Sequence, residues 1–81
     1  MLRYYKPKYS IEYLNEDAKV NVEIPMPDCT VKFTYHFILC KDRVVIAKSH
    51  HQYSHIVGER MTTDVSKAVE SLVKLDELRY H

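Results

Sequence analysis

The chain has few of the residues that break regular structure or cross-link it: one Gly, three Pro, two Cys and no Trp occur among its 81 residues. A single glycine excludes nucleotide binding by a glycine-rich loop, because such a loop needs several glycines to bring its backbone N–H groups around a phosphate. No segment approaches the roughly 18 apolar residues of a membrane-spanning helix, and the first ten residues lack the long apolar run of a signal peptide. We therefore expect a cytoplasmic protein with no membrane partner.

The two cysteines, Cys29 and Cys40, stand at opposite ends of one alternating run. If this run is a continuous strand, its ends lie roughly 36 Å apart at about 3.3 Å per residue. A disulfide requires Cα atoms within about 7 Å of each other. We therefore expect two free thiols in a reducing, intracellular compartment.

The length of the chain allows one small domain, which we assign to residues 1–81. Hydrophobic residues make up 46% and charged residues 28%, as in ordinary globular domains. The net charge of +1 supplies no large field for nucleic acid or a membrane. Residues 30–60 nevertheless carry five Lys or Arg against two Asp or Glu, with four of the five histidines, so a mild basic bias lies in the middle of the chain.

Strands are predicted wherever apolar and polar residues alternate. The longest alternation is residues 29–40, CTVKFTYHFILC, which is rich in aromatic and β-branched residues. Shorter alternations predict strands at Tyr9–Leu14 and Ala18–Ile24, and Arg43–Ser49 predicts a fourth strand with its register open by one residue. Gln52–Val57 either extends this strand or forms a fifth one. Together they predict an antiparallel meander.

The segment after the strands predicts a turn and then a helix. Gly58 is the only glycine and is expected to mark a turn with positive φ. Thr62, Thr63 and Asp64 are typical of a helix start, because their side chains can cap free backbone N–H groups. The helix is expected to run to about Leu78. Its apolar stripe is expected to comprise Val65, Ala68, Val69, Leu72, Val73 and Leu75.

These elements predict an α+β domain: a four- or five-stranded antiparallel β-meander followed by one C-terminal α-helix packed on one sheet face. The predicted inner sheet residues are Val20, Val22, Ile24, Val31, Phe33, Tyr35 and Phe37. A helix of about sixteen residues is roughly 24 Å long and can cover one face of a small sheet but not both. The other face is therefore expected to stay open.

Candidate catalytic and metal-binding residues are sparse. His36, His50, His51 and His55 lack the spacing of a zinc site and have no cysteine pair beside them. Cys40 lies near basic residues, but the sequence identifies no base to accept its proton. We expect no metal, no cofactor, no catalytic residue and no enzymatic activity.

The sequence therefore favours a small non-enzymatic interaction protein, an inhibitor or adaptor that binds a partner protein through the outer sheet face and the loop that follows the central hairpin. This profile is typical of accessory proteins encoded by viruses and mobile elements, including those directed at host defence complexes. The alternative is a nucleic-acid-binding domain that uses the basic central hairpin, and exposed strand edges make a homodimer compatible with either function. The candidate partner-binding residues are Lys32, His36, Lys48, His50, His51, Tyr53 and Arg60.

Overall fold

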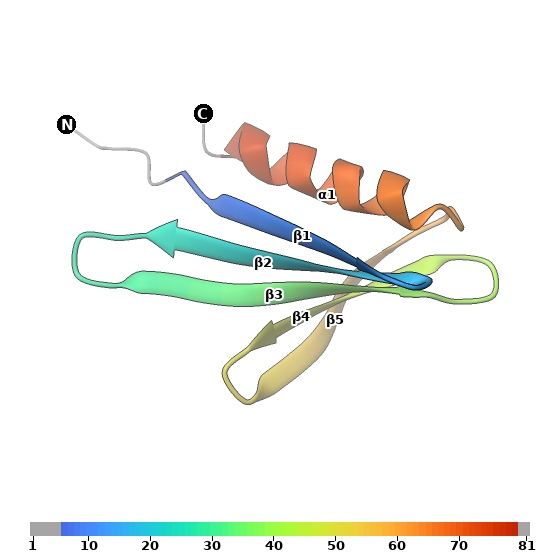
Figure 1. The fold of residues 1–81 in the computed structure, drawn as a ribbon, viewed down its shortest axis with the longest axis horizontal. Coiled ribbons are helices and arrows are strands. Elements are labelled where there is room, and N and C mark those ends of the chain that lie inside the picture. Colours follow the sequence, from blue (N-terminus) through green and yellow to red (C-terminus); the bar gives the residue numbers. More distant parts are fainter. Residues whose placement is uncertain (1–5, 80–81) are drawn as a thin grey trace.

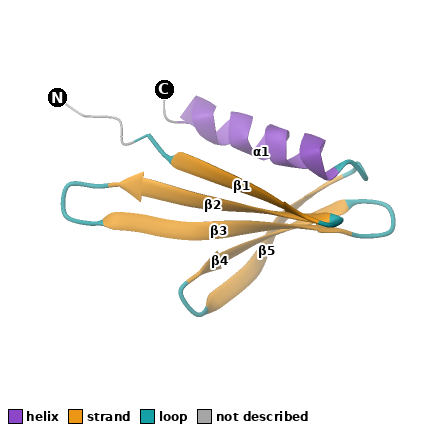
Figure 2. Ribbon diagram, viewed as in Figure 1, coloured by secondary structure: helices purple, strands orange, loops and turns teal. Residues whose placement is uncertain are grey.

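The computed structural model describes residues 6–79, which form one antiparallel sheet and one helix (Figures 1 and 2). The five strands lie in the sheet in chain order, as a simple meander, and the helix follows them. The predicted α+β fold is confirmed, with five strands. The elements are β1 Lys8–Leu14, β2 Asp17–Pro25, β3 Thr30–Leu39, β4 Val44–His50, β5 Tyr53–Arg60 and α1 Val65–Arg79.

Short turns keep neighbouring strands adjacent. Leu14 pairs with Asp17, which leaves a two-residue loop in which Asn15 has a φ of 53°. The β4–β5 loop is equally short, and its first residue, His51, has a φ of 56°. Two-residue hairpin loops favour such positive φ values, because they match the twist of the flanking strands.

The β4–β5 pair contains a β-bulge. Ile46 pairs with Gly58 and Ala47 pairs with Ile56, so Val57 is the extra residue. The prediction that Gly58 marks a turn with positive φ is therefore wrong: this glycine lies within β5, and its φ is not positive. A bulge bends a strand and increases its twist. The β4–β5 hairpin is angled away from the other strands in Figure 1.

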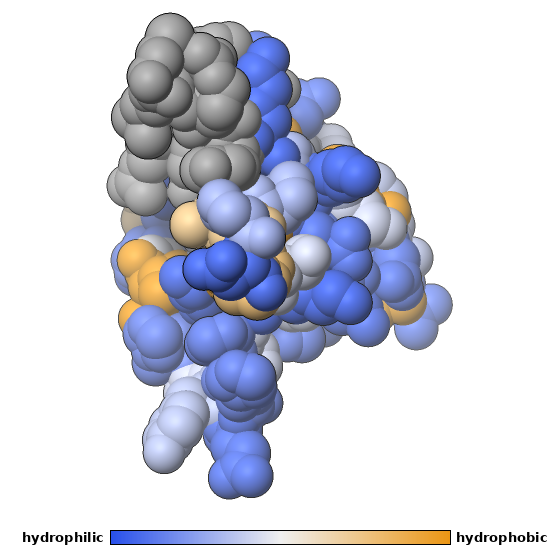
Figure 3. Space-filling view, turned by 90° about the vertical axis from the view of Figure 1, so that its left-hand side faces the viewer, coloured by the Kyte–Doolittle hydropathy of each residue, from blue (hydrophilic) through white to orange (hydrophobic). Residues whose placement is uncertain are grey.

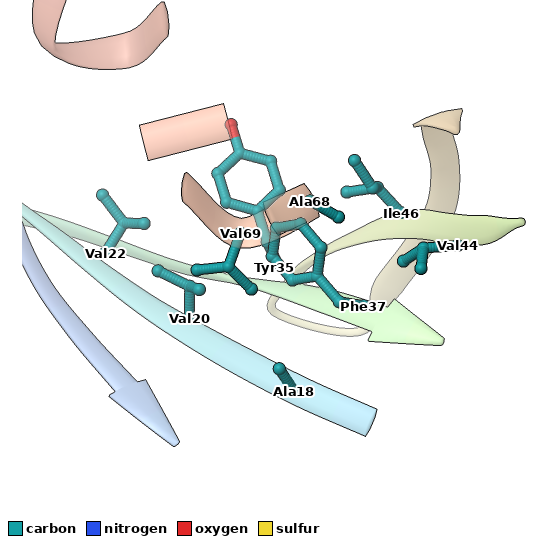
Figure 4. Close-up of a cluster of buried hydrophobic side chains, with 9 residues drawn as sticks. All are labelled: Ala18, Val20, Val22, Tyr35, Phe37, Val44, Ile46, Ala68 and Val69. Atoms are coloured by element: carbon teal, nitrogen blue, oxygen red, sulfur yellow. The ribbon is translucent and has the colours of Figure 1, made fainter. Parts of the chain in front are cut away.

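The core lies between the sheet and α1 (Figure 4). It is formed by every second side chain of the strands, the ones that face the helix, together with residues of α1. Phe37 pairs with Ala18 on one side and Ile46 on the other, which fixes the register of β4 that the sequence leaves open. Val44 and Ile46 therefore face the helix, and Val45 and Ala47 face away from it. The buried cluster consists of Ala18, Val20, Val22, Tyr35, Phe37, Val44, Ile46, Ala68 and Val69.

The helix α1 begins where the sequence predicted, but one residue of its predicted apolar stripe is exposed. Asp64 caps α1, because its Oδ1 accepts hydrogen bonds from the backbone N–H groups of Ser66 at 3.1 Å and Lys67 at 3.4 Å. Leu75, predicted in the apolar stripe, is exposed, whereas Asp76 is buried. Asp76 lies seven residues after Val69, which is two helical turns, and so falls on the same face.

Cys29 and Cys40 are free, as predicted, and both are exposed. Within residues 6–79, no helix is both long and apolar enough to cross a membrane.

Candidate interaction surface

The face of the sheet opposite α1, here called the outer face, carries a hydrogen-bonded polar row. Thr34 donates from Oγ1 to Asn21 Oδ1 at 2.9 Å, and Asn21 donates from Nδ2 to Glu12 Oε1 at 3.3 Å. The row therefore crosses β3, β2 and β1. These side chains bond to one another and remain solvated, as is usual for the open face of an antiparallel sheet.

An apolar patch lies beside this polar row, over β3, β4 and β5. It consists of Ile38, Val45, Ala47 and Ile56, and is called the β3–β5 patch below. Ile38 pairs directly with Val45, and Ala47 pairs directly with Ile56. Ile38 is 42% exposed and Ile56 is 71% exposed. Directly paired residues place their side chains side by side, so these four lie next to one another. Ala47 itself is buried among its neighbours, and the accessible apolar surface is that of Ile38, Val45 and Ile56.

Charged residues border the patch near the β3–β4 turn. Nη1 of Arg43 lies 2.8 Å from Oε1 of Glu59 and 3.1 Å from its Oε2, and the Arg43 Nε lies 3.1 Å from Oδ1 of Asp42. The hydrogen bonds and positive charge of Arg43 lower the pKa of Asp42. The two carboxylates in turn raise the pKa of Arg43. Asp42 and Arg43 therefore stabilise each other in their charged forms.

Lys32 and His36 lie on the outer face, as the sequence predicted. Lys32 Nζ is 3.6 Å from Glu23 Oε1. Lys32 also shares the lining of a hollow of about 390 Å³ with His51. His36 is half-buried and pairs with Ala47, so its ring borders the β3–β5 patch.

Lys48 and Arg60 lie on the helix side of the sheet. The prediction that Lys48 belongs to the outer face is therefore wrong, and Arg60, predicted in the loop after the central hairpin, ends β5 instead. Lys48 pairs with the buried Tyr35, and its Nζ lies 4.3 Å from the centroid of the Phe33 ring. Arg60 donates from Nε to Ser71 Oγ in α1 at 2.8 Å. The register of β4, which the sequence left open, is the reason for the error at Lys48. For Arg60, the sequence did not reveal that β5 extends to this residue.

His50, His51 and Tyr53 form the tip of the β4–β5 hairpin, and all three are exposed. The rings of His50 and His51 lie with their centroids 4.2 Å apart, tilted by 46°. This hairpin is the lowest part of the molecule in Figure 1, and the lowest part of Figure 3 is a narrow, hydrophilic protrusion. The predicted partner-binding residues therefore occupy three places: the outer face, the hairpin tip and the helix side.

Metal binding has no geometric support in the part of the chain that the structure describes. No group of three His, Cys, Asp or Glu side chains gathers there in a way that could hold an ion. The histidines that cluster in the sequence are divided between β3 (His36), the hairpin tip and β5 (His55).

The sequence indicated only part of the β3–β5 patch. Ile38 follows from the alternation, since Phe37 beside it was predicted to face inward. Val45 and Ala47 depended on an open register, and Ile56 lay in Gln52–Val57, whose place in the sheet was also open. One signal was present: Leu39 faces inward, and a short loop that pairs it with Val44 makes Val44 face inward too. Val45 must then face outward.

No protein-family model, curated protein or solved structure matches this chain.

Proposed function

We propose that this protein is a non-enzymatic interaction protein, an inhibitor or adaptor that binds a partner protein on the outer face of its sheet. The β3–β5 patch is the anchor of this surface, and the hairpin tip with His51 and Tyr53 extends it. The observation that carries the proposal is the accessible apolar surface of Ile38, Val45 and Ile56, which lies around the buried Ala47 on the face opposite α1.

The composition of this surface is that of a protein-binding site. Interfaces between proteins have an apolar centre and a polar rim, and a few central residues carry most of the binding energy. Ile38 and Ile56 supply the apolar centre, and Arg43, Glu59 and His36 supply a charged and polar border. Tyr53, which is exposed at the hairpin tip, brings contact area with little conformational freedom to lose.

The arrangement of charge favours a protein partner over nucleic acid. Lys19 pairs with Glu12 across β1 and β2, and Lys32 lies beside Glu23. The basic residues between positions 30 and 60 are also divided between the two faces, since Lys48 and Arg60 lie on the helix side. Phosphate binding needs a concentrated positive surface, and its affinity falls steeply with added salt.

The test is capture of partners from a lysate of the cells in which the protein is made, with quantitative mass spectrometry of wild-type and variant baits. Ile38→Asp and Ile56→Asp place a charge in the apolar centre. We expect a specific protein to be retained by wild type and reduced at least tenfold with either variant, because a buried unpaired carboxylate opposes docking strongly.

Met61→Asp is the matched control. Met61 is 73% exposed, close to the 71% of Ile56, but it follows β5 outside the patch. This variant should retain the partner. The proposal is wrong if every protein captured by wild type is also captured by both isoleucine variants, or if the bound material is nucleic acid that salt removes.

A further inference from the structure

The two edges of the sheet differ in how open they are to another strand. The β1 edge strand pairs with β2 one residue to one from Lys8 to Leu14, without a bulge, and has no strand on its other side among the described residues. The β5 edge strand carries the bulge at Val57. Bulges protect an edge by twisting it away from approaching strands, so β1 is the more receptive edge.

The helix also leaves apolar surface uncovered beside β1. Ile11 and Tyr13 pair with buried residues of β2 and occupy helix-side positions, yet they are 44% and 57% exposed. Together with Val69 and Val73 of α1 they line a groove of about 350 Å³. This groove opens at the sheet edge, where a further strand would bring side chains over Ile11.

We propose that β1 pairs antiparallel with β1 of a second copy of this chain, about a two-fold axis at Ser10. In this register Lys8 faces Glu12 of the second copy, Tyr9 faces Ile11, and Ser10 faces its own equivalent. The strand is therefore complementary to itself: each interface contains two opposite-charge pairs and two aromatic–aliphatic pairs, both of which stabilise neighbouring strands. The same patch is used on both copies, as a two-fold dimer requires.

The other registers are less favourable. If the pairing is shifted by one residue, a helix-side residue lies opposite an outer-face residue. A two-fold axis perpendicular to the sheet keeps every residue on its own face and therefore does not allow this pairing. A pairing centred on Ile11 retains the faces, uses all seven residues of β1 and sets Tyr9 against Tyr13. It leaves both charged residues without an opposite charge, because Lys8 then faces Leu14 and Glu12 faces Ser10. Charge complementarity therefore selects the register centred on Ser10.

This dimer would form one ten-stranded sheet, with both helices on the same face. Because β1 and β5 are opposite edges of each sheet, both β3–β5 patches would stay free at the two far ends. The inference is thus independent of the proposed partner binding, and it would give the assembly two equal docking surfaces.

Cysteine cross-linking tests the register directly. In a background with Cys29→Ser and Cys40→Ser, Ser10→Cys places two thiols opposite each other across the axis, within the distance of a disulfide. We expect Ser10→Cys to form a reducible dimer under mild oxidation. Ser54→Cys is the matched control, since Ser54 is an exposed serine in the other edge strand, and it should stay monomeric. Equal cross-linking of both variants would overturn the proposal.

Charge reversal supplies a second test that a folding defect cannot imitate. Lys8→Glu and Glu12→Lys should each be monomeric in sedimentation equilibrium at concentrations where wild type approaches twice its 9.6 kDa mass. An equimolar mixture of the two variants should form a heterodimer, because every interface charge is then opposite an unlike charge. The proposal is overturned if wild type stays at 9.6 kDa at all concentrations, or if the mixture stays monomeric.

Discussion

Arg60 at the end of β5 donates a 2.8 Å hydrogen bond from Nε to Oγ of Ser71 in α1. The Ser71 hydroxyl in turn donates to the carbonyl oxygen of Ala68 at 3.1 Å, and Arg60 Nη1 donates to the carbonyl oxygen of Glu59 at 2.9 Å. The first bond joins the helix to the last strand across the connection formed by residues 61–64, and the other two hold its partners in place. Arg60 therefore positions α1 over the sheet.

Arg60→Met should lower the free energy of unfolding by about 1–2 kcal/mol, because it removes a partly buried, charge-assisted hydrogen bond. Ser71→Ala should lower it by about 1 kcal/mol or less. In the double-mutant cycle the two residues should show a coupling of at least about 0.5 kcal/mol. Urea denaturation of the four proteins measures it, and purely additive effects would show that the bond contributes nothing to helix docking.

Two consecutive residues of β3 test the assignment of the sheet faces. Phe37→Ala should destabilise the fold by about 3–5 kcal/mol, because it leaves a cavity in the core. Ile38→Ala should change stability by no more than about 0.5 kcal/mol, because Ile38 lies on the exposed outer face. Thermal and chemical denaturation of both variants measure the two losses of stability. A larger loss for Ile38→Ala than for Phe37→Ala would show that the two faces are assigned the wrong way round.

The cap of α1 should make stability depend on pH. The hydroxyl of Ser66 and then the backbone N–H of Lys67, which both donate hydrogen bonds to its carboxylate, lower the pKa of Asp64 below its ordinary value. A carboxylate whose pKa is lowered in the folded state stabilises the fold above its unfolded pKa, and this contribution is lost as the pH falls through the folded pKa.

Asp64→Asn retains an oxygen that can cap the helix but removes the charge. Wild type should therefore be more stable than this variant at pH 7, and the difference should shrink as the pH falls below about 4, where unfolded aspartates become protonated. Chemical denaturation at several pH values measures the difference. A difference that is the same at pH 2 and pH 7 would contradict a charge-based role for the cap.

Gly58→Ala should be tolerated, in contrast to what a positive-φ turn would require. The nearest atom that an added Cβ would meet is Nη1 of Arg60 at 3.7 Å, an ordinary van der Waals contact. Since the backbone of Gly58 is accessible to alanine, the variant should gain about 0.4–1 kcal/mol by restricting the unfolded chain. A loss of stability in urea denaturation would show that the bulge itself needs glycine.

The fold could be predicted because binary patterning is strong in most of the chain. β2 and β3 alternate cleanly, and their inward residues Val20, Val22, Tyr35 and Phe37 are the buried ones. The helix start was readable from Asp64 and its neighbours. The strand β5 was the hardest to predict. Its large apolar residues Tyr53, Ile56 and Val57 are all exposed, so burial does not alternate along this strand. A bulge, which is set by pairing with β4, further disrupts the period of two.

The candidate surface was less predictable than the fold, because it depends on register. A one-residue uncertainty in β4 decided whether Lys48 or Ala47 lies on the outer face. The burial of Asp76 was also not predicted. The buried face of a helix is recognised in a sequence by its apolar residues, and a charged residue on that face does not contribute to the pattern. The open outer face could be predicted, because a single helix covers only one face of the sheet. The apolar patch on it could not, because its residues are brought together by the pairing of β3, β4 and β5.

The most direct test of the docking surface is site-specific photo-crosslinking in cells. A photoreactive phenylalanine analogue placed at position 56 lies within the β3–β5 patch, and the same analogue at position 61 is equally exposed outside it. We expect irradiation to link position 56, but not position 61, to a second protein different from this chain. Equal linkage at both positions, or linkage only at position 61, would contradict the assignment of the outer face as the partner-binding surface.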